Sequence, residues 1–366
     1  MAETRLGGHL AIRAPNWVGD LVMSTPVLAT ALESPQWTRV TILLRRHLAG
    51  VLADGPWADS VTLIEDSADE FDALKRLAPD AVLLLTNSFS AAWRAFVARV
   101  PVRAGATLSG RRLLLTHALC PPVRAGRRAP IPTAHLMRDV AGLVGLLPDS
   151  LHPRLGVRAE IAADVAADVA AGLRQRGADP ARGYALCSPG AAFGAAKLWP
   201  PESYARVLDA IHERHGWSGV VTGGPGEEAL VERVVQRCRH AALSLAGERR
   251  DLERLKALVR ESRLLVVGDS GPRWYAAAFD VPCVTVMGPN FPELTASSLE
   301  LCEVVRHTGL ECAPCLNRTC PLPDHRCMRE LSPGRVLQAV ERVLARAPRP
   351  ARAAPPARRA AVGGAP

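Results

Sequence analysis

Short apolar runs bounded by polar turns alternate with helix-like segments along the first half of the chain. The runs that predict strands are residues 10–13, 40–44, 61–64 and 81–85. Helical segments are expected from Asp20, around Leu28, around Phe96 and over residues 136–147. Strands that alternate with helices in this way predict a parallel sheet covered by helices.

A second alternating series follows an Ala-rich helical segment. That segment, residues 161–176, ends before Gly177, and Asp179 and Pro180 then indicate a break. Further strands are predicted at residues 184–188, 217–222, 264–268 and 282–287, and helices at 202–214, 226–239, 252–260, 273–279 and 332–344. The pattern predicts two α/β domains in tandem, residues 1–177 and 178–345.

Composition agrees with a folded protein of this kind. The 366 residues allow two domains that each bury a core, and 48% apolar with 22% charged residues is ordinary for globular proteins. No run approaches the roughly 20 apolar residues of a membrane span, and no signal-peptide pattern is present, so we expect a cytoplasmic protein.

The net charge of +9 favours anionic partners. Part of that charge lies in residues 346–366, which carry five arginines and no acidic residue, and this Pro/Ala/Arg-rich tail is expected to be disordered. Residues 121–132 are also rich in Pro, Arg and Gly and predict a mobile loop in or beside the first domain.

Asn16-Trp17-Val18-Gly19-Asp20 directly follows the first predicted strand. Ligands of open parallel sheets bind at the carboxyl ends of strands, where the following helices begin. Because Gly19 has no side chain, a neighbouring group could approach the backbone closely there. Asp20 would either cap the next helix or project into a cleft as a general base, and both alternatives stand.

The second half carries comparable turns at its strand ends. Ser188-Pro189-Gly190 leads to Lys197 just before a helix, an arrangement that can hold phosphate between backbone N–H groups and an ammonium, although a solvated surface lysine is the plain alternative. In Gly268-Asp269-Ser270-Gly271-Pro272 the N–H groups of Ser270 and Gly271 would face a phosphate, or the turn is merely capped. Glu227 closes a Gly-rich turn where a carboxylate could take ribose hydroxyls.

Taken together and in this order, the motifs resemble the lipopolysaccharide heptosyltransferase family from His9 to about Leu344. The most specific matches are Trp17-Val-Gly-Asp20, Pro189-Gly-Ala-x-Phe-Gly-x-Ala-Lys197-x-Trp-Pro200, and Asp269-Ser-Gly271 followed by Gly288-Pro289. The first two are more similar to the heptosyltransferase II branch.

The resemblance implies a GT-B arrangement, two Rossmann-like domains with parallel sheets facing across a cleft, and inverting transfer without a catalytic metal. It implies Asp20 as catalytic base and Lys197 as the lysine that neutralises charge on the departing ADP. Asp269, Ser270 and Gly271 match the diphosphate turn, and Glu227 matches the ribose-binding carboxylate.

The resemblance also implies partners: ADP-heptose as donor and the anionic inner core of lipopolysaccharide, with its Kdo and heptose sugars on lipid A, as acceptor. We expect peripheral contact with the inner face of the inner membrane and no nucleic acid. The basic loop with Arg124, Arg127 and Arg128 would meet the acceptor, since each basic residue near an anionic lipid surface contributes about 1 kcal/mol. A solvated loop is the alternative.

One position departs from the family pattern. A His usually follows the Asp-Ser-Gly turn, whereas this chain has Trp274 at the matching place, beside Arg273. Trp supplies no cationic donor, although Arg273 could. The departure bears on donor contacts, activity and sugar choice.

Cys312, Cys315, Cys320 and Cys327 fall within sixteen residues, with His325 among them. Thiolates at such spacings can surround one Zn²⁺, yet the spacing is not that of a standard finger. Structural zinc, reduced structural cysteines and a redox pair or cluster are the three alternatives. Because the cluster follows the nucleotide motifs, no catalytic role is expected for it.

Three other functions compete with heptose transfer. The same scaffold could use another nucleotide sugar or acceptor, or could be a non-catalytic nucleotide-sugar-binding protein, although Asp20 argues against the latter. Nucleic-acid binding through the basic tail predicts a steep salt dependence, but no aromatic-plus-basic stacking pattern accompanies the charge.

Overall fold

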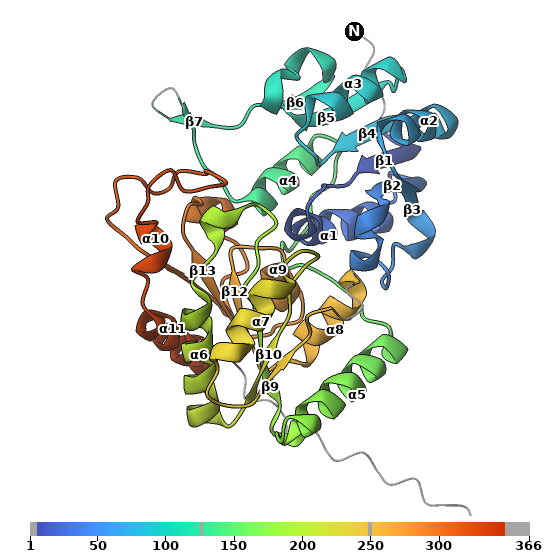
Figure 1. Ribbon diagram of the computed structural model, residues 1–366. Coiled ribbons are helices and arrows are strands. Elements are labelled where there is room, and N and C mark those ends of the chain that lie inside the picture. Colours follow the sequence, from blue (N-terminus) through green and yellow to red (C-terminus); the bar gives the residue numbers. More distant parts are fainter. Residues whose placement is uncertain (1–5, 125–126, 248–250, 348–366) are drawn as a thin grey trace, which may run out of the picture.

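Two six-stranded parallel sheets lie one above the other in the computed structural model, which describes residues 6–124, 127–247 and 251–347 (Figure 1). The strands of the first sheet are β1 (His9–Arg13), β2 (Arg39–Arg45), β3 (Val61–Ile64), β4 (Ala81–Leu84), β5 (Val102–Ala106) and β6 (His117–Leu119). Those of the second are β9 (Tyr184–Ser188), β10 (Ser218–Val221), β11 (Ala242–Ser244), β12 (Leu264–Gly268), β13 (Cys283–Met287) and β14 (Cys302–Arg306).

Both sheets have the same strand order. It is β3-β2-β1-β4-β5-β6 in the first and β11-β10-β9-β12-β13-β14 in the second. All five residues of β1 and of β9 are buried, because helices cover both faces of a parallel sheet and leave no polar side. The predicted α/β class is confirmed, and the order is that of a doubly wound Rossmann sheet.

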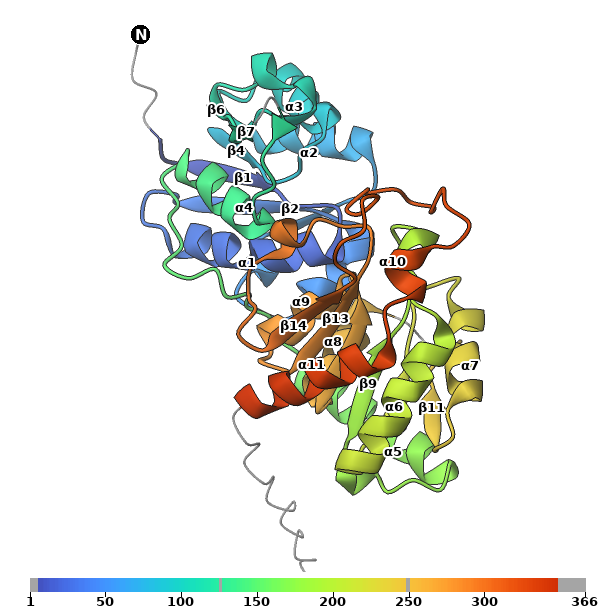
Figure 2. The ribbon, with the colours of Figure 1, turned by 90° about the vertical axis from the view of Figure 1, so that its left-hand side faces the viewer.

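Helices flank each sheet on both faces (Figures 1 and 2). In the first half they are α1 (Val18–Glu33), α2 (Ser67–Leu77), α3 (Phe89–Val97) and α4 (Thr133–Gly142), with 3-10 turns η1 (Arg46–Val51), η2 (Ala58–Ser60), η3 (Leu108–Gly110) and η4 (Arg112–Leu114). In the second they are α5 (Ala159–Gln175), α6 (Pro201–His215), α7 (Glu228–Arg237), α8 (Leu252–Glu261), α9 (Pro272–Ala278), α10 (Arg326–Arg329) and α11 (Pro333–Arg346), with η5 (Pro180–Arg182), η6 (Ala195–Lys197) and η7 (Pro292–Thr295). No helix in the described ranges is long and apolar enough to cross a bilayer.

Several elements were not anticipated from the sequence. Strands β5, β6, β11 and β14 are short or interrupted by Gly or charged residues, so their apolar runs are weak. Helix α2 is highly charged, but Asp66 caps it by accepting from the N–H groups of Ala68 and Asp69. Local capping can therefore define a helix whose apolar stripe is narrow.

The loop predicted at residues 121–132 contains a small antiparallel ladder. It pairs β7 (Val123–Arg124) with β8 (Arg127–Arg128). The side chains of Arg124, Arg127 and Arg128 lie outside the described part of the structure, as do residues 348–366 of the tail predicted over 346–366. Their expected roles stay predictions. At residue 346 the predicted disorder is wrong, because Arg346 ends helix α11 and donates to Glu303 (2.7 Å).

Helix α5 packs with the second sheet, although the predicted boundary at residue 177 assigned it to the first domain. It contacts α8 and β11, and Figure 1 shows it beside the lower sheet. Its buried stripe of Ala162, Val165, Val169 and Leu173 explains this, because the stripe covers apolar side chains of the second half. All strands of the first sheet precede residue 178, and all strands of the second sheet follow it.

The first and second halves contact each other closely beside the first turn of α1. A Cβ placed on Gly19 would lie 2.7 Å from Cδ1 of Trp274, and one placed on Gly271 would lie 3.0 Å from Cβ of Val18. Farther away, Lys256 of α8 donates to the carbonyl oxygens of Val51 (3.1 Å) and Gly156 (2.9 Å). Glycines therefore let the two helix N-termini approach, and buried hydrogen bonds join the halves.

The Gly19 contact leads to a prediction. Gly19→Ala should lower kcat/KM of the sugar transfer that the family resemblance implies by about tenfold or more. The added methyl would push Trp274 away, and displacements of about 1 Å are costly in an oriented site. Steady-state kinetics in single and double variants checks it. In a Trp274→Ala background the same substitution should cost much less, and equal losses in both backgrounds would contradict the steric cause.

Candidate active site

A cleft of about 540 Å³ lies between the two sheets, at the carboxyl ends of their central strands. This is the place where the strand order of each sheet reverses and where doubly wound folds bind their ligands. Residues from both halves line it: Asn16, Trp17, Val18, Gly19, His47 and Leu48 from the first, and Ser188, Gly190, Gly223, Gly224, Glu227, Leu245, Leu255, Leu258, Ser270 and Gly271 among those from the second.

The predicted site residues divide into two groups at this cleft. Glu227, Ser270 and Gly271 line it directly, whereas Asp20, Lys197 and Asp269 do not. Asp20 follows the lining residue Gly19, and Asp269 precedes the lining residue Ser270. All six are thus gathered at one region, with Asp20 contributed by the first sheet and the others by the second.

Asp20 is the third residue of α1 and does not cap it. The N-cap position is Trp17, which makes no side-chain capping bond, so the capping alternative for Asp20 is wrong. Burial removes water from this carboxylate and raises its pKa to about 6, while the positive charge of Lys197 lowers the pKa. A carboxylate with such a pKa is ionised at neutral pH and accepts a proton more readily than an exposed one.

Lys197 ends η6, the turn between β9 and α6. Its Nζ donates to Oδ2 of Asp269 (2.5 Å) and to the Asp269 carbonyl oxygen (3.1 Å), and it lies 4.7 Å from the centre of the Phe193 ring. Asn290 donates to the same Oδ2 of Asp269 (2.8 Å). The Asp269 carboxylate therefore orients the ammonium group, and the lysine is not the solvated surface residue that was the alternative.

The turn after β12 places donors at the cleft. The Ser270 hydroxyl is buried and has no hydrogen-bond partner among the described residues. Gly271 precedes Pro272, the first residue of α9, and the cleft reaches all three positions. A diphosphate oxygen would satisfy the Ser270 hydroxyl.

Glu227 lies where the turns after β9 and β10 meet. Its Oε2 accepts from the Gly224 N–H (2.6 Å), and a Cβ on Gly190 would overlap its carboxylate at 1.8 Å. The glycine of the Pro-Gly-Ala motif is thus required because a carboxylate occupies the space above it. A carboxylate held at this strand end can accept hydrogen bonds from sugar hydroxyls.

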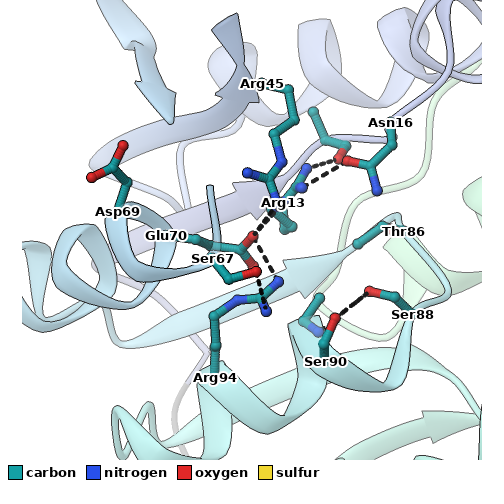
Figure 3. A network of polar contacts seen from close by, with 12 residues as sticks. Arg13, Asn16, Arg45, Ser67, Asp69, Glu70, Thr86, Ser88, Ser90 and Arg94 are labelled. Carbon is teal, nitrogen blue, oxygen red and sulfur yellow. Dashed lines mark hydrogen bonds and ion pairs between the residues drawn. The ribbon is translucent and has the colours of Figure 1, made fainter. Parts of the chain in front are cut away.

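A buried ion network supports the turn that carries Asn16 (Figure 3). Arg13, at the end of β1, donates to Glu70 Oε2 (2.9 Å) and to Oδ1 of Asn16 (2.7 Å), and Arg94 donates to the same Glu70 oxygen (2.9 Å). Glu70 is only 1% exposed. Sequence reasoning missed this network, because a charged pair split between β1 and α2 has no local signature.

Trp274 and Arg273 take different places. Trp274 is buried against Gly19 at the junction of the two halves. Arg273 is turned toward β14: it donates to the carbonyl oxygens of Thr295 (2.9 Å) and Ser297 (3.1 Å) and to the Cys302 sulfur (3.3 Å). The alternative in which Arg273 supplies the cationic donor of the usual His is therefore excluded, because its guanidinium bonds to groups away from the turn after β12.

The cysteine-rich segment lies against the Lys197 turn. His325 Nε2 is 2.9 Å from the Ala196 carbonyl oxygen, and the Ala196 N–H donates to the Arg318 carbonyl oxygen (2.9 Å). Gly194 allows this approach, because a Cβ there would lie 2.4 Å from that same Arg318 oxygen. The segment thus supports the turn that ends at Lys197, which its position in the sequence did not suggest.

All four cysteines of the cluster are unpaired. Cys312 and Cys315 are exposed, Cys320 is half-buried and Cys327 is buried. Burial first, then the field of the other three thiols, raises the pKa of Cys327 to about 11. Among the residues described, no three His, Cys, Asp or Glu side chains converge to hold a metal ion. In this arrangement the thiols are neighbours but not a ligand set.

Comparison with known proteins identifies the family. Residues 71–325 match the model of glycosyltransferase family 9 (heptosyltransferase). The chain is 25% identical to lipooligosaccharide heptosyltransferase 2 of Haemophilus ducreyi, covering 92% of this chain and 99% of that protein. It is 28% identical to lipooligosaccharide heptosyltransferase 2 of Campylobacter jejuni over 43% of this chain, and there it spans half of the relative's length.

The fold has a solved counterpart. The structure of Escherichia coli ADP-heptose lipopolysaccharide heptosyltransferase II superposes with a TM-score of 0.71 at 22% identity, over 92% of this chain and 98% of that one. This likeness confirms the predicted GT-B fold. Since the family model covers more than two thirds of the chain and its motifs meet at one cleft, this chain belongs to glycosyltransferase family 9, the heptosyltransferase family.

Proposed function

We propose that this protein transfers a heptose from ADP-heptose to the inner core of lipopolysaccharide, with inversion at the transferred sugar. One observation carries the proposal: Asp20 directly follows the lining residue Gly19 of the first half, and Lys197 of the second half is bound to Asp269, which directly precedes the lining residue Ser270. A base from one half and a cation from the other, both next to cleft-lining residues, are the two groups that displacement of a diphosphate requires.

The second half would bind the donor. Ser270 and Gly271 at the start of α9 would receive the diphosphate, and Glu227 would receive the ribose hydroxyls. The apolar side chains of Leu245, Leu255 and Leu258 line the same cleft and offer a surface for the adenine ring. The family names in the comparison are the ground for heptose as the sugar.

The reaction would be a single displacement. An acceptor hydroxyl oxygen forms a bond to the anomeric carbon from the face opposite the diphosphate, and the bond from that carbon to the phosphate oxygen breaks. The hydroxyl proton passes to the Asp20 carboxylate. The electron pair of the broken bond stays with ADP, whose growing negative charge Lys197 stabilises.

The pH dependence of the reaction follows from Asp20. Its pKa of about 6 lies above the ordinary value, so kcat/KM should be constant near neutral pH and fall as pH drops through about 6, where the base becomes protonated. A pH–rate profile with a controlled donor concentration measures this. A fall in kcat/KM centred near pH 4 instead would contradict the buried environment of Asp20.

We propose that catalysis needs no metal ion, because Lys197 supplies the positive charge that would otherwise come from a cation. A chelator should leave turnover unchanged.

For the cysteines, the neighbouring thiols keep structural zinc among the alternatives, while their present arrangement favours reduced thiols. Metal analysis of purified protein decides: about one ion per chain supports zinc, and less than about a tenth contradicts it.

The acceptor side is proposed to be anionic and lipid-linked. We place the protein at the cytoplasmic face of the inner membrane, in peripheral contact with it. The supporting observation is the basic character of the first half around its β7–β8 ladder. Basic residues near an anionic surface contribute about 1 kcal/mol each, which suits reversible binding.

A transfer assay tests the proposal. Wild-type protein is mixed with ADP-heptose and either a Kdo-lipid A or a heptosylated acceptor, and both ADP release and the product are measured. Transfer supports the proposal. ADP binding without transfer favours a non-catalytic nucleotide-sugar-binding protein. Transfer from a different nucleotide sugar would point to altered donor choice, for which Trp274 in place of the usual His is the specific reason.

A further inference from the structure

Helix α3 presents an apolar face to solvent. Phe89, Trp93, Phe96 and Val97 follow one another at spacings of four, three and one residues, so they share one side of the helix. They are between 41% and 49% exposed, whereas the opposite side, with Ala91, Ala92 and Ala95, is buried. Most surface helices place their apolar side inward, so this face requires an explanation.

The exposed rings form a continuous patch. Phe89 and Trp93 stack with their ring centres 6.5 Å apart, and Trp93 and Phe96 are 5.9 Å apart. Leu113 of η4, the most exposed apolar side chain of this region at 93%, belongs to a turn that contacts α3. We call Phe89, Trp93, Phe96, Val97 and Leu113 the α3 patch.

The chain segment that carries the α3 patch is basic. Residues 81–138 contain nine arginines and no Asp or Glu, while the neighbouring helix α2 contributes the exposed carboxylates Asp69 and Asp72. Arg99 and Arg112 are exposed, Arg103 lies 5.5 Å over the Phe96 ring, and none of these three forms an ion pair with any described residue. Exposed aromatic rings next to guanidinium groups without a carboxylate partner match the boundary between lipid headgroups and acyl chains of an anionic bilayer.

The position of the patch suits a lipid-linked substrate. Phe89 begins α3 just beyond the carboxyl end of β4, at the same sheet edge from which Asn16 enters the cleft. Figures 1 and 2 both show α3 on the side of the first sheet that is remote from the second. A bilayer could therefore contact α3 without obstructing the second half.

We propose that the α3 patch docks this protein on an anionic bilayer surface, with the aromatic rings at headgroup depth and Arg99 and Arg112 against lipid phosphates. A second copy of the chain is a poorer occupant, because a symmetric contact would bring the unpaired Arg99, Arg103 and Arg112 of the two copies together. The inference extends the proposed function and rests on it, since it locates the membrane contact of an enzyme whose acceptor is lipid-linked.

Co-sedimentation of the full chain with vesicles tests the proposal. At about 0.15 M salt, where surface charges beyond roughly 8 Å are screened, wild-type protein should sediment with phosphatidylglycerol vesicles and much less with phosphatidylcholine vesicles. Trp93→Glu should lower the bound-to-free ratio by about tenfold or more, because it puts a charge where a ring would enter the bilayer. Leu322→Glu, at an exposed apolar position of the second half (39% exposed), is the matched control and should bind like wild type.

Three results would overturn the proposal. The first is a wild-type protein that does not bind anionic vesicles, and the second is a Trp93→Glu variant that binds them as wild type does. The third is a wild-type protein that binds no vesicles but forms a dimer in sedimentation velocity, which Trp93→Glu dissociates. An unchanged melting temperature shows that Trp93→Glu folds, and Phe96→Ser serves as a second variant if it does not.

The transfer assay separates this proposal from the proposed function. With a water-soluble, delipidated acceptor, Trp93→Glu should retain wild-type turnover, because it lies outside the cleft. If the wild-type protein transfers heptose but does not bind vesicles, only the docking proposal is refuted. If it binds vesicles but transfers no heptose, only the proposed function is refuted.

Discussion

Replacing Asp20 with Asn is expected to lower kcat of heptose transfer by about 10³-fold, since general bases typically contribute 10²- to 10⁴-fold. The Asn side chain has nearly the same shape but accepts no proton in this pH range. Because Asp20 contributes no side-chain bond to the α1 terminus, the helix should keep its start at Val18. Single-turnover kinetics and ADP titration should show that the loss is in chemistry and not in donor binding.

The same substitution should raise the melting temperature at pH 7. The pKa of Asp20 in the folded chain, about 6, lies above the unfolded value of 3.8, so the folded state binds the proton more tightly between these pH values. Ionisation of Asp20 therefore costs stability as pH rises through that window, and the cost persists at pH 7. The neutral side chain of Asp20→Asn removes that cost.

Asp72→Asn, at an exposed position of α2, is the control and should change neither turnover nor stability. Full activity in Asp20→Asn would refute the base assignment.

Removal of the Lys197 ammonium should lower kcat/KM by about 10²- to 10³-fold, the range found when one preorganised donor is lost. In Lys197→Ala the departing ADP loses its nearest cation, and the buried Asp269 carboxylate keeps only Asn290 as a side-chain partner among the described residues. ADP affinity should also fall, but by less than kcat/KM, because more charge develops on the diphosphate during bond breaking than is present in the bound donor.

Lys75→Ala is the matched control for this variant, because Lys75 is an exposed lysine of α2 and is not among the cleft-lining residues. Circular dichroism checks that Lys197→Ala keeps its fold. A double variant with Asp269→Asn tests the pairing: if Asp269 acts by orienting Lys197, the second substitution should add little. Independent, additive losses would instead give Asp269 a separate contact with the donor.

The cysteine segment and the ion network show how remote parts of the chain support this site. Residues near Arg318 and His325 hold the backbone of the Lys197 turn, more than a hundred positions earlier in the sequence. Likewise, Glu70 of α2 reaches Asn16 through Arg13. Neither support was expected, because a hydrogen bond to a backbone carbonyl leaves no motif of its own.

The sequence by itself determined the α/β class, most of the central strands and the turns that meet at the cleft. Buried parallel strands require continuous apolar runs, and turns next to ligands require Gly and polar residues at strand ends, so both leave local patterns. Asp20, Lys197, Glu227 and the Asp269 turn were all recognisable in this way. Short edge strands such as β6 and β11, and the charged helix α2, were not, because their apolar patterns are weak.

Only the tertiary structure decided what these residues do to one another. It shows that Asp20 does not cap α1 and that Arg273 bonds away from the turn after β12. It also shows that Trp274 packs against Gly19 and that α5 packs with the second sheet. It also exposed the α3 patch, which a helical pattern alone would have placed in the core. The physical reason is common to all: burial, pKa and orientation depend on which surfaces meet, and residues far apart in the chain determine that.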